Sequence, residues 1–419
     1  MGKERKIFIN IILLLCVAVV MASCKSDEEE NVDPRNVYHE AEHTVLIYMV
    51  AENALSSFVK EDLKEMKAGS RSIGDNNLVV YVDRSYKNEL PWLARLKDGQ
   101  VIDSVSIADM GIANGDVYSS DPRVFEDVIR YAFNHYKATK GYGLVLWGHS
   151  SGWMIEQEIT TTRAYGVDNG KNEGSNEGYW INIPTIKKVL EGLPHLDFIF
   201  ADCCNFMCLE SLYELRTVTD YIAGSPAEIP ARGAPYDKVM PYLFSDDVEQ
   251  GMLQVMEIYG KDNQSYQPYL PLSVVKTSKM DDIAAATRTA LQEVTASLGG
   301  GYADMTGIIH YYYLGDIDKK FNAGYNIYYD AGDFMLKHTS ESTYAMWKEA
   351  LDQVVIGKRF ASSWMSIKTW NVYFADFTAT TQKYHGVSMF VPQDPDKGAG
   401  YNKYNEDIKQ LEWYDTVWK

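Results

Sequence analysis

The sequence predicts an α/β fold in which a mainly parallel β-sheet is covered by helices on both faces. Continuous apolar runs alternate along the chain with segments of helical periodicity. Strands buried on both faces have this unbroken apolar character, whereas half-exposed strands alternate between apolar and polar residues. Functional side chains are then expected at the carboxyl ends of the parallel strands. Buried strands are predicted at residues 43–53, 76–84, 141–147, 196–202 and 219–225.

Helical patterns and turn signals separate these strands. Apolar residues recur at helical spacing in 55–69, 181–193 and 209–218. Asp121-Pro122 supplies a cap and a first-turn proline for another helix, and 92–107 alternates as a β-hairpin does. The polar loop after residue 147 runs for about 30 residues, and a loop of that length is usually functional or disordered.

The second half of the chain contains longer helical stretches. It also holds two more strand candidates, 271–278 and 385–392, so this C-terminal helical region is expected to extend the sheet. Tyrosines are concentrated in 308–315 and 325–334. These stretches are expected to pack against the sheet rather than line a carbohydrate or ligand cleft.

The N-terminus has the pattern of a bacterial lipoprotein signal peptide. Basic residues precede an apolar run at 7–20, which is shorter than the roughly 20 residues that a membrane span needs. Small residues then lead to Cys24, the expected lipidated residue, although plain secretion is the alternative. The predicted organisation is a signal peptide at 1–23, a flexible acidic tether at 24–42, a catalytic α/β domain at 43–240 and a C-terminal α/β extension at 241–419.

Charge and cysteine content limit the partners. The formal net charge of −18 makes nucleic acid and anionic membrane surfaces poor partners. Downstream of Cys24 only Cys203, Cys204 and Cys208 remain, and an odd set within six residues is no disulfide framework. At least one free thiol is therefore expected.

Residues 148–152 read Gly-His-Ser-Ser-Gly, which allows two interpretations. Ser150 could be the nucleophile of a G-x-S-x-G elbow, but no good helix pattern follows it and no oxyanion segment of the HGGG type precedes it. The histidines further along, His195, His310 and His385, have no clear aspartate partner in the sequence. The alternative assigns the function to His149.

The second interpretation requires a nucleophile at the end of a neighbouring strand. Cys203 and Cys204 directly follow the apolar run 196–202, and His149 follows the run 141–147 at a similar distance. Neighbouring parallel strands would bring the histidine and a thiol to one edge, where a helix N-terminus favours the thiolate. A Cys/His zinc site fits badly, because the clustered cysteines contain no C-x-x-C pair.

Several motifs together resemble the clostripain family of cysteine peptidases, in the clan of caspases, gingipains, legumain and separase. They are the strand-terminal His149, the Asp-x-Cys of Asp202 and Cys204, and the segments 45–55, 210–240 and 386–392. The resemblance implies a caspase-like sheet, a catalytic dyad of His149 and Cys204, and cleavage after arginine or lysine. The alternative is an inactive homologue that serves as a surface binding protein through its tyrosine-rich C-terminal half.

The resemblance also implies roles for neighbouring residues. Asp202 and Glu228 become candidates for binding the basic P1 side chain, although helix capping is an alternative for Asp202. The backbone amides of Ser150 and Cys204 are expected to form the oxyanion hole. Relatives usually have glycine and a small residue where this chain has Ser150 and Cys203, so Ser150 is expected to crowd a donor and Cys203 to offer a competing thiol.

Other family properties concern activation and location. Some members are cut between the histidine and cysteine strands, and Arg163 and Lys171 are the candidate self-processing sites here. No cofactor is required by the sequence; some relatives use calcium, for which Asp168 and Glu173 are candidate ligands without EF-hand spacing. The acidic stretch after Cys24 resembles the export signal of Bacteroidetes surface lipoproteins. We therefore expect a monomer on the outer membrane, exposed at the cell surface, with protein or peptide substrates.

Overall fold

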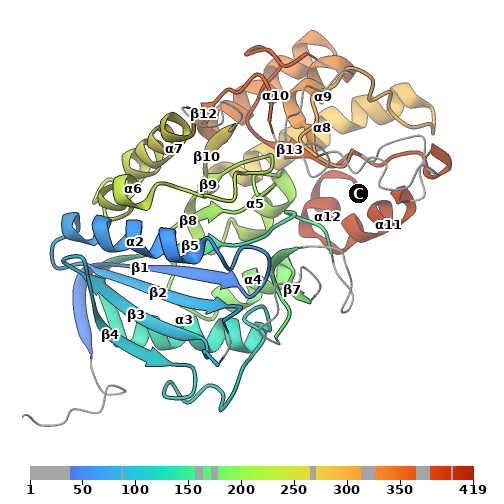
Figure 1. The fold of residues 1–419 in the computed structure, drawn as a ribbon. Helices are drawn as coiled ribbons and strands as arrows, with labels where there is room; N and C mark the ends of the chain where they lie inside the picture. Colours follow the sequence, from blue (N-terminus) through green and yellow to red (C-terminus); the bar gives the residue numbers. More distant parts are fainter. Residues whose placement is uncertain are drawn as a thin grey trace, which may run out of the picture. The chain divides into compact units, whose positions relative to one another are not determined.

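A nine-stranded β-sheet runs through the part of the chain that the structure describes (Figure 1). The computed structural model describes residues 38–86, 88–155, 164–170, 178–264, 270–312, 326–364, 378–397 and 400–419. The predicted signal peptide, Cys24, Arg163, Lys171 and Glu173 lie outside these residues. Tyr38–Lys419 forms one compact unit, in which the predicted catalytic domain and extension are not divided.

Five parallel strands form the middle of the sheet, and two antiparallel strands continue it on each side. The order is β12-β10-β9-β8-β5-β1-β2-β3-β4. The parallel strands are β1 (His39–Ala51), β2 (Asn77–Arg84), β5 (Tyr136–Trp147), β8 (Leu196–Asp202) and β9 (Thr219–Gly224). The antiparallel strands are β3 (Trp92–Lys97), β4 (Gln100–Ser106), β10 (Leu272–Lys276) and β12 (Val355–Arg359).

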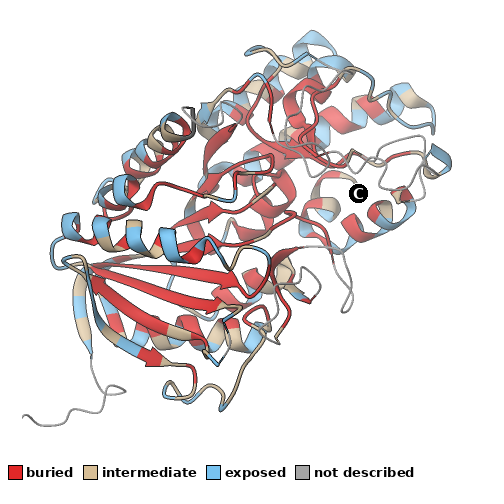
Figure 2. Ribbon diagram, viewed as in Figure 1, coloured by how far each residue is buried: buried red, intermediate tan, exposed pale blue. Residues whose placement is uncertain are grey.

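Helices pack on both faces, so the central strands are buried almost throughout (Figure 2). One face is covered by α2 (Val59–Gly69), α6 (Tyr236–Leu243) and α7 (Val248–Gln264). The core on the other face includes residues of α3 (Pro122–His135), α4 (Ile183–Leu190), α5 (Leu209–Leu215), α8 (Met280–Leu298), α9 (Ala331–His338), α10 (Glu341–Val354), α11 (Tyr401–Asp407) and α12 (Glu412–Val417). The unbroken apolar strands of the sequence follow from this two-sided burial.

The predicted fold class is confirmed, with local differences. The Asp121 side chain caps α3 by accepting from the Arg123 amide, as the Asp-Pro pair predicted. β1 begins at His39, so the tether predicted to run to residue 42 ends earlier. The predicted strand 271–278 is β10 and extends the sheet, but the segment 385–392 contributes only β13 (Ser388–Met389), which pairs with β11 (Tyr329–Asp330) in a separate sheet.

The described tyrosines of the two tyrosine-rich stretches pack in the interior, in agreement with the prediction. Tyr311, Tyr312, Tyr328 and Tyr329 are each at most 4% exposed. Within the described residues, no helix has the length and apolar character that crossing a membrane demands.

The C-terminal part also holds the segment that follows Cys204. The Ser388 amide donates to the Met207 carbonyl at 3.0 Å, and the Phe390 amide donates to Glu210 Oε1 at 2.7 Å. The start of α5 is therefore fixed by residues about 180 positions later in the chain.

Asp62 provides a test of how burial affects stability. Its Oδ2 accepts from the Trp147 indole at 2.7 Å, and burial, with the nearby charge of Asp202, raises the pKa of Asp62 to about 8. Because the unfolded pKa is about 3.9, the native state holds the proton more tightly, and this contribution to stability is lost as pH rises from about 4 through 8.

Replacing Asp62 by asparagine is therefore expected to flatten the fall in stability with pH. The amide oxygen can still accept from Trp147 while the titrating group is gone. Melting temperatures at about pH 5 and about pH 9 check this: wild type should lose more than Asp62→Asn, and equal losses would contradict it.

Candidate active site

The parallel register brings His149 and Cys204 to matching positions. Trp147 lies opposite Asp202 in the pairing of β5 with β8. His149 and Cys204 each come two residues beyond these partners. Both residues therefore follow neighbouring parallel strands at the same edge of the sheet.

Burial distinguishes the same two residues from their neighbours. From Gly143 through Ile155, His149 is the one residue that is not buried. From Phe198 through Leu215, the same is true of Cys204. Two partly exposed reactive side chains in otherwise buried segments can meet a substrate, whereas the surrounding residues cannot.

The two glycines of 148–152 are explained by backbone geometry. Gly148 has φ of +150°, and a Cβ there would lie 3.0 Å from the Val50 carbonyl oxygen. Gly152 has φ of +58°, and a Cβ there would lie 2.4 Å from the Asn205 carbonyl oxygen. Both glycines of the G-x-S-x-G match are therefore required by the local backbone, whichever residue is functional.

Ser150 is a buried residue that pairs with a neighbouring segment of the chain. It is 6% exposed and forms an antiparallel bridge with Tyr165, and no helix follows within the described residues up to Ile155. Its hydroxyl accepts from the Gly152 amide at 3.1 Å and hydrogen-bonds to the Cys203 thiol. The two departures from the family pattern, Ser150 and Cys203, therefore contact each other, and both are buried whereas Cys204 is partly exposed.

Cys203, Cys204 and Cys208 are all free, which agrees with the prediction of at least one free thiol, but they differ in environment. Cys203 and Cys208 are fully buried. Burial raises the pKa of Cys203 well above its usual value and that of Cys208 to about 12. Cys204 is partly exposed, and its sulfur accepts from the Ile229 amide at 3.4 Å. Cys204 is thus the thiol best placed to react, since a thiolate is the nucleophile.

The helix after the thiol differs from expectation. α5 begins at Leu209, five residues beyond Cys204, so its N-terminus does not follow the thiol directly. The support for a thiolate that the structure shows is the Ile229 amide.

Asp202 lies on the face of the sheet covered by α6 and α7. It is 3% exposed and accepts from the hydroxyls of Tyr236 at 2.8 Å and Tyr259 at 3.1 Å, and from the Ala234 amide at 3.1 Å. All three donors are neutral, and burial raises its pKa. None belongs to α5, so the alternative of a helix cap was wrong.

A loop after β9 contacts the Cys204 thiol. The Ala227 carbonyl accepts from the Asn205 amide at 2.9 Å, and the Ile229 amide contacts Cys204. Glu228 lies between these two residues and is 9% exposed. The structure therefore brings Glu228 to the turn that carries the nucleophile.

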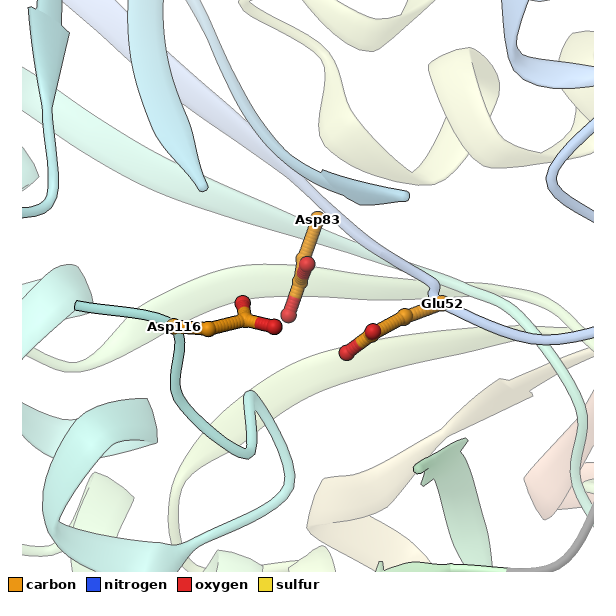
Figure 3. A group of neighbouring side chains, drawn as sticks. All are labelled: Glu52, Asp83 and Asp116. Carbon is orange, nitrogen blue, oxygen red and sulfur yellow. The ribbon is translucent and has the colours of Figure 1, made fainter. Parts of the chain in front are cut away.

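A group of carboxylates lies at the same edge of the sheet and was not predicted as a group. Glu52, Asp83 and Asp116 point toward one another, with ligand oxygens within 4.8 Å (Figure 3). Asp168 hydrogen-bonds to Glu52 and Asp83, and burial, then the charge of Asp168, raises the pKa of Asp83. Glu52 directly follows β1, and Asp83 lies at the end of β2, so each comes at the end of an apolar strand as His149 does. This position in the sequence could have identified them as candidates.

Two histidines have aspartate partners that the sequence did not reveal. His195 Nε2 lies 3.0 Å from Asp220, and buried His385 Nδ1 lies 2.8 Å from Asp330. The expectation that these histidines lack such partners was wrong. Neither pair includes Ser150. The other ring nitrogen of His385, Nε2, contacts the Tyr344 hydroxyl at 2.9 Å.

A caspase-like sheet with a histidine and a cysteine at adjacent strand ends is the arrangement of a cysteine peptidase. The sequence model of the Clostripain family matches residues 47–419, and the chain belongs to that family. Clostripain from Hathewaya histolytica is 25% identical over 221 residues, which cover 47% of this chain and 41% of clostripain. The match thus spans less than half the length of that relative.

Solved structures agree with this assignment. A secreted C11 cysteine protease from Bacteroides thetaiotaomicron, in complex with an irreversible peptide inhibitor, is 28% identical with a TM-score of 0.69. An inactive zymogen C11 protease from Parabacteroides distasonis is 27% identical with a TM-score of 0.72. Each comparison covers 90% of this chain and 99% of the other. The predicted family and fold are confirmed.

Proposed function

We propose that this protein is a cysteine endopeptidase that hydrolyses peptide bonds after arginine or lysine, using His149 and Cys204. The observation that carries the proposal is the register of β5 and β8, which aligns the one partly exposed residue of each strand end. Family membership favours this function over that of an inactive binding homologue. The buried tyrosines of the C-terminal half also offer little surface for the binding role.

The proposed reaction is acyl transfer through a thioester. His149 takes the proton of Cys204, and the thiolate forms a bond to the scissile carbonyl carbon. The amides of Cys204 and Ser150 donate hydrogen bonds to the developing oxyanion. The bridge between Ser150 and Tyr165 does not use the Ser150 amide, because its hydrogen bonds run from the Ser151 amide to the Ala164 carbonyl and from the Gly166 amide to the His149 carbonyl. His149 then protonates the leaving amine, and water attacks the thioester to release the acid and restore the thiol.

Two carboxylates support a preference for a basic P1 side chain. Asp202 ends the strand that precedes the nucleophile, and its present donors are all neutral. A guanidinium beside it would gain a strong charge-assisted interaction, because the surroundings are dry. Glu228 adds a second carboxylate in the loop that contacts Cys204.

A P1 panel and site mapping test the proposal. Purified residues 25–419 with reductant should hydrolyse peptide amides with P1 arginine much faster than the same peptides with P1 glutamate or alanine. An arginine chloromethyl ketone should label Cys204, while Cys203 and Cys208 stay unlabelled because they are buried. Label on another residue, or no preference for a basic P1 residue, would contradict the dyad or the P1 assignment respectively.

Location and activation are part of the proposal on sequence grounds. Lipidation of Cys24 would anchor a monomer to the outer membrane with its catalytic unit facing outward. Cleavage after Arg163 or Lys171 would occur between the strands that carry His149 and Cys204. Mass spectrometry of the mature protein from cells tests the lipid and both cleavage positions.

Calcium is the cofactor whose chemistry fits residues of this chain. Carboxylate oxygens are the ligands that calcium prefers, and Glu52, Asp83, Asp116 and Asp168 supply them at the edge that bears the dyad. When bound, the ion would supply positive charge that offsets these carboxylates. Glu52 directly follows β1 and Asp83 lies at the end of β2, so binding of the ion would fix the loops beside His149.

Chelation is expected to lower stability if the cluster holds calcium. EGTA should reduce the melting temperature, and calcium at about 100-fold above its Kd should restore about 2.7 kcal/mol. Asp83→Asn should remove this response while keeping the Ser119 contact, in which the hydroxyl lies 2.5 Å from Asp83. A calcium response that is unchanged in Asp83→Asn would place the ion elsewhere.

A further inference from the structure

Asn205, directly after the proposed nucleophile, has a left-handed backbone. Its φ is +53°. Within the described residues, the other non-glycine residues with positive φ are Asn88 and Asp98, and both are exposed. Asn205 is 1% exposed, so its conformation is fixed by packing rather than by a surface turn. Such outliers in the interior are concentrated at functional sites.

Contacts on two sides hold this conformation. The Asn205 amide donates to the Ala227 carbonyl at 2.9 Å, in the loop whose Ile229 amide contacts the Cys204 sulfur. The Asn205 carbonyl lies so close to Gly152 that a Cβ there would approach it to 2.4 Å. The backbone of one residue therefore contacts both the loop after β9 and the turn that follows His149.

The side chain of Asn205 adds a second unfavourable feature. Its Oδ1 is buried without a hydrogen-bond partner in the described part of the chain. Buried polar atoms without partners cost free energy and are rare in native proteins. Asparagine adopts the left-handed region more readily than other residues with a side chain, so the residue type suits the backbone although its side chain gains nothing visible from the site.

We propose that Asn205 is a positioning residue for the nucleophile, and that its left-handed turn directs the Cys204 thiol and amide toward the scissile carbonyl. The inference rests on the proposed catalytic role of Cys204. An ordinary right-handed backbone at 205 would turn the Asn205 amide and carbonyl away from their contacts with the Ala227 carbonyl and Gly152. The binding of a basic P1 side chain by Asp202 would be affected less, because Asp202 is held by Ala234, Tyr236 and Tyr259 rather than by this turn.

Alanine and glycine at position 205 separate the backbone from the side chain. Asn205→Ala, which disfavours positive φ, is expected to lower kcat by about 100-fold with a small change in KM, because the nucleophile is misplaced. Asn205→Gly should stay within about threefold of wild-type kcat, since glycine adopts this conformation without steric cost. The inactivation rate by an arginine chloromethyl ketone should fall in Asn205→Ala more than the rate by iodoacetamide, which needs no oriented carbonyl.

Asn88 is the matched control. It has φ of +65° at an exposed position. Asn88→Ala should show the stability loss of an unfavourable backbone with kcat unchanged. The inference is overturned if Asn205→Ala keeps kcat within twofold of wild type, or if folded Asn205→Gly loses more than tenfold. If wild type cleaves no P1-arginine peptide and its Cys204 resists the chloromethyl ketone, the proposed function itself fails, which is a different result.

Discussion

Cys204→Ala is expected to abolish peptide hydrolysis, with a loss in kcat of about 10⁴-fold or more, because no other group can form the acyl intermediate. Cys203 cannot replace it: that thiol is fully buried, and burial raises its pKa well above its usual value. The folded state should be little changed, since Cys204 is partly exposed and the hydrogen bond from the Ile229 amide to its sulfur is long, at 3.4 Å. Hydrolysis of a P1-arginine amide measures the loss.

Ser150→Ala and Cys203→Ala are the controls for this prediction. They hydrogen-bond to each other and are both buried, so each should retain kcat within about tenfold and lose about 1 kcal/mol of stability. If Ser150→Ala alone were inactive, the serine would be the nucleophile after all. If Cys203→Ala matched Cys204→Ala, the assignment of the reactive thiol would be wrong.

Gly152→Ala is expected to impair both folding and catalysis. The left-handed backbone costs an alanine about 1 kcal/mol, and the new Cβ would also lie 2.4 Å from the Asn205 carbonyl oxygen. Because that oxygen belongs to the backbone of the nucleophile turn, relief of the clash must move the loops of His149 and Cys204 apart. We expect a total loss of about 3 kcal/mol or more and a fall in kcat of about 100-fold.

Gly74→Ala separates the cost of the left-handed backbone from the cost of the steric clash. Gly74 has φ of +62°, close to that of Gly152, but a Cβ there would meet nothing within 4 Å. Its loss should be about 1 kcal/mol with kcat unchanged. Denaturant midpoints and kcat for both variants provide the comparison. Equal stability losses would show that the clash is absorbed without movement of the loops.

The sheet, and the positions of His149 and Cys204 at its edge, could be predicted because both depend on local sequence. A strand buried on both faces needs an unbroken apolar run, and a reactive residue directly after such a run must lie at the edge of the sheet. The pattern at 141–149 and at 196–204 contained this information without any knowledge of long-range contacts. The Asp121-Pro122 helix start was equally local.

Features that depend on distant partners could not be predicted. The environment of Asp202 comes from Tyr236 and Tyr259, and that of His385 from Asp330. Nothing near these residues in the sequence indicates such pairs. The left-handed turn at Asn205 is imposed by packing against Ala227 and Gly152, whereas local preference would allow several conformations.

The attachment of the segment after Cys204 to residues far along the chain affects how the protein is made. The amides of Ser388 and Phe390 hold Met207 and Glu210, just beyond Cys204. During synthesis, the ribosome adds residues 388–390 about 180 positions after Cys204. A nascent chain would therefore carry a thiol whose surroundings stay incomplete until those residues have been made. For a peptidase, this delay would protect the cell that makes it, because shorter nascent chains would lack the contacts that hold the segment beyond the thiol.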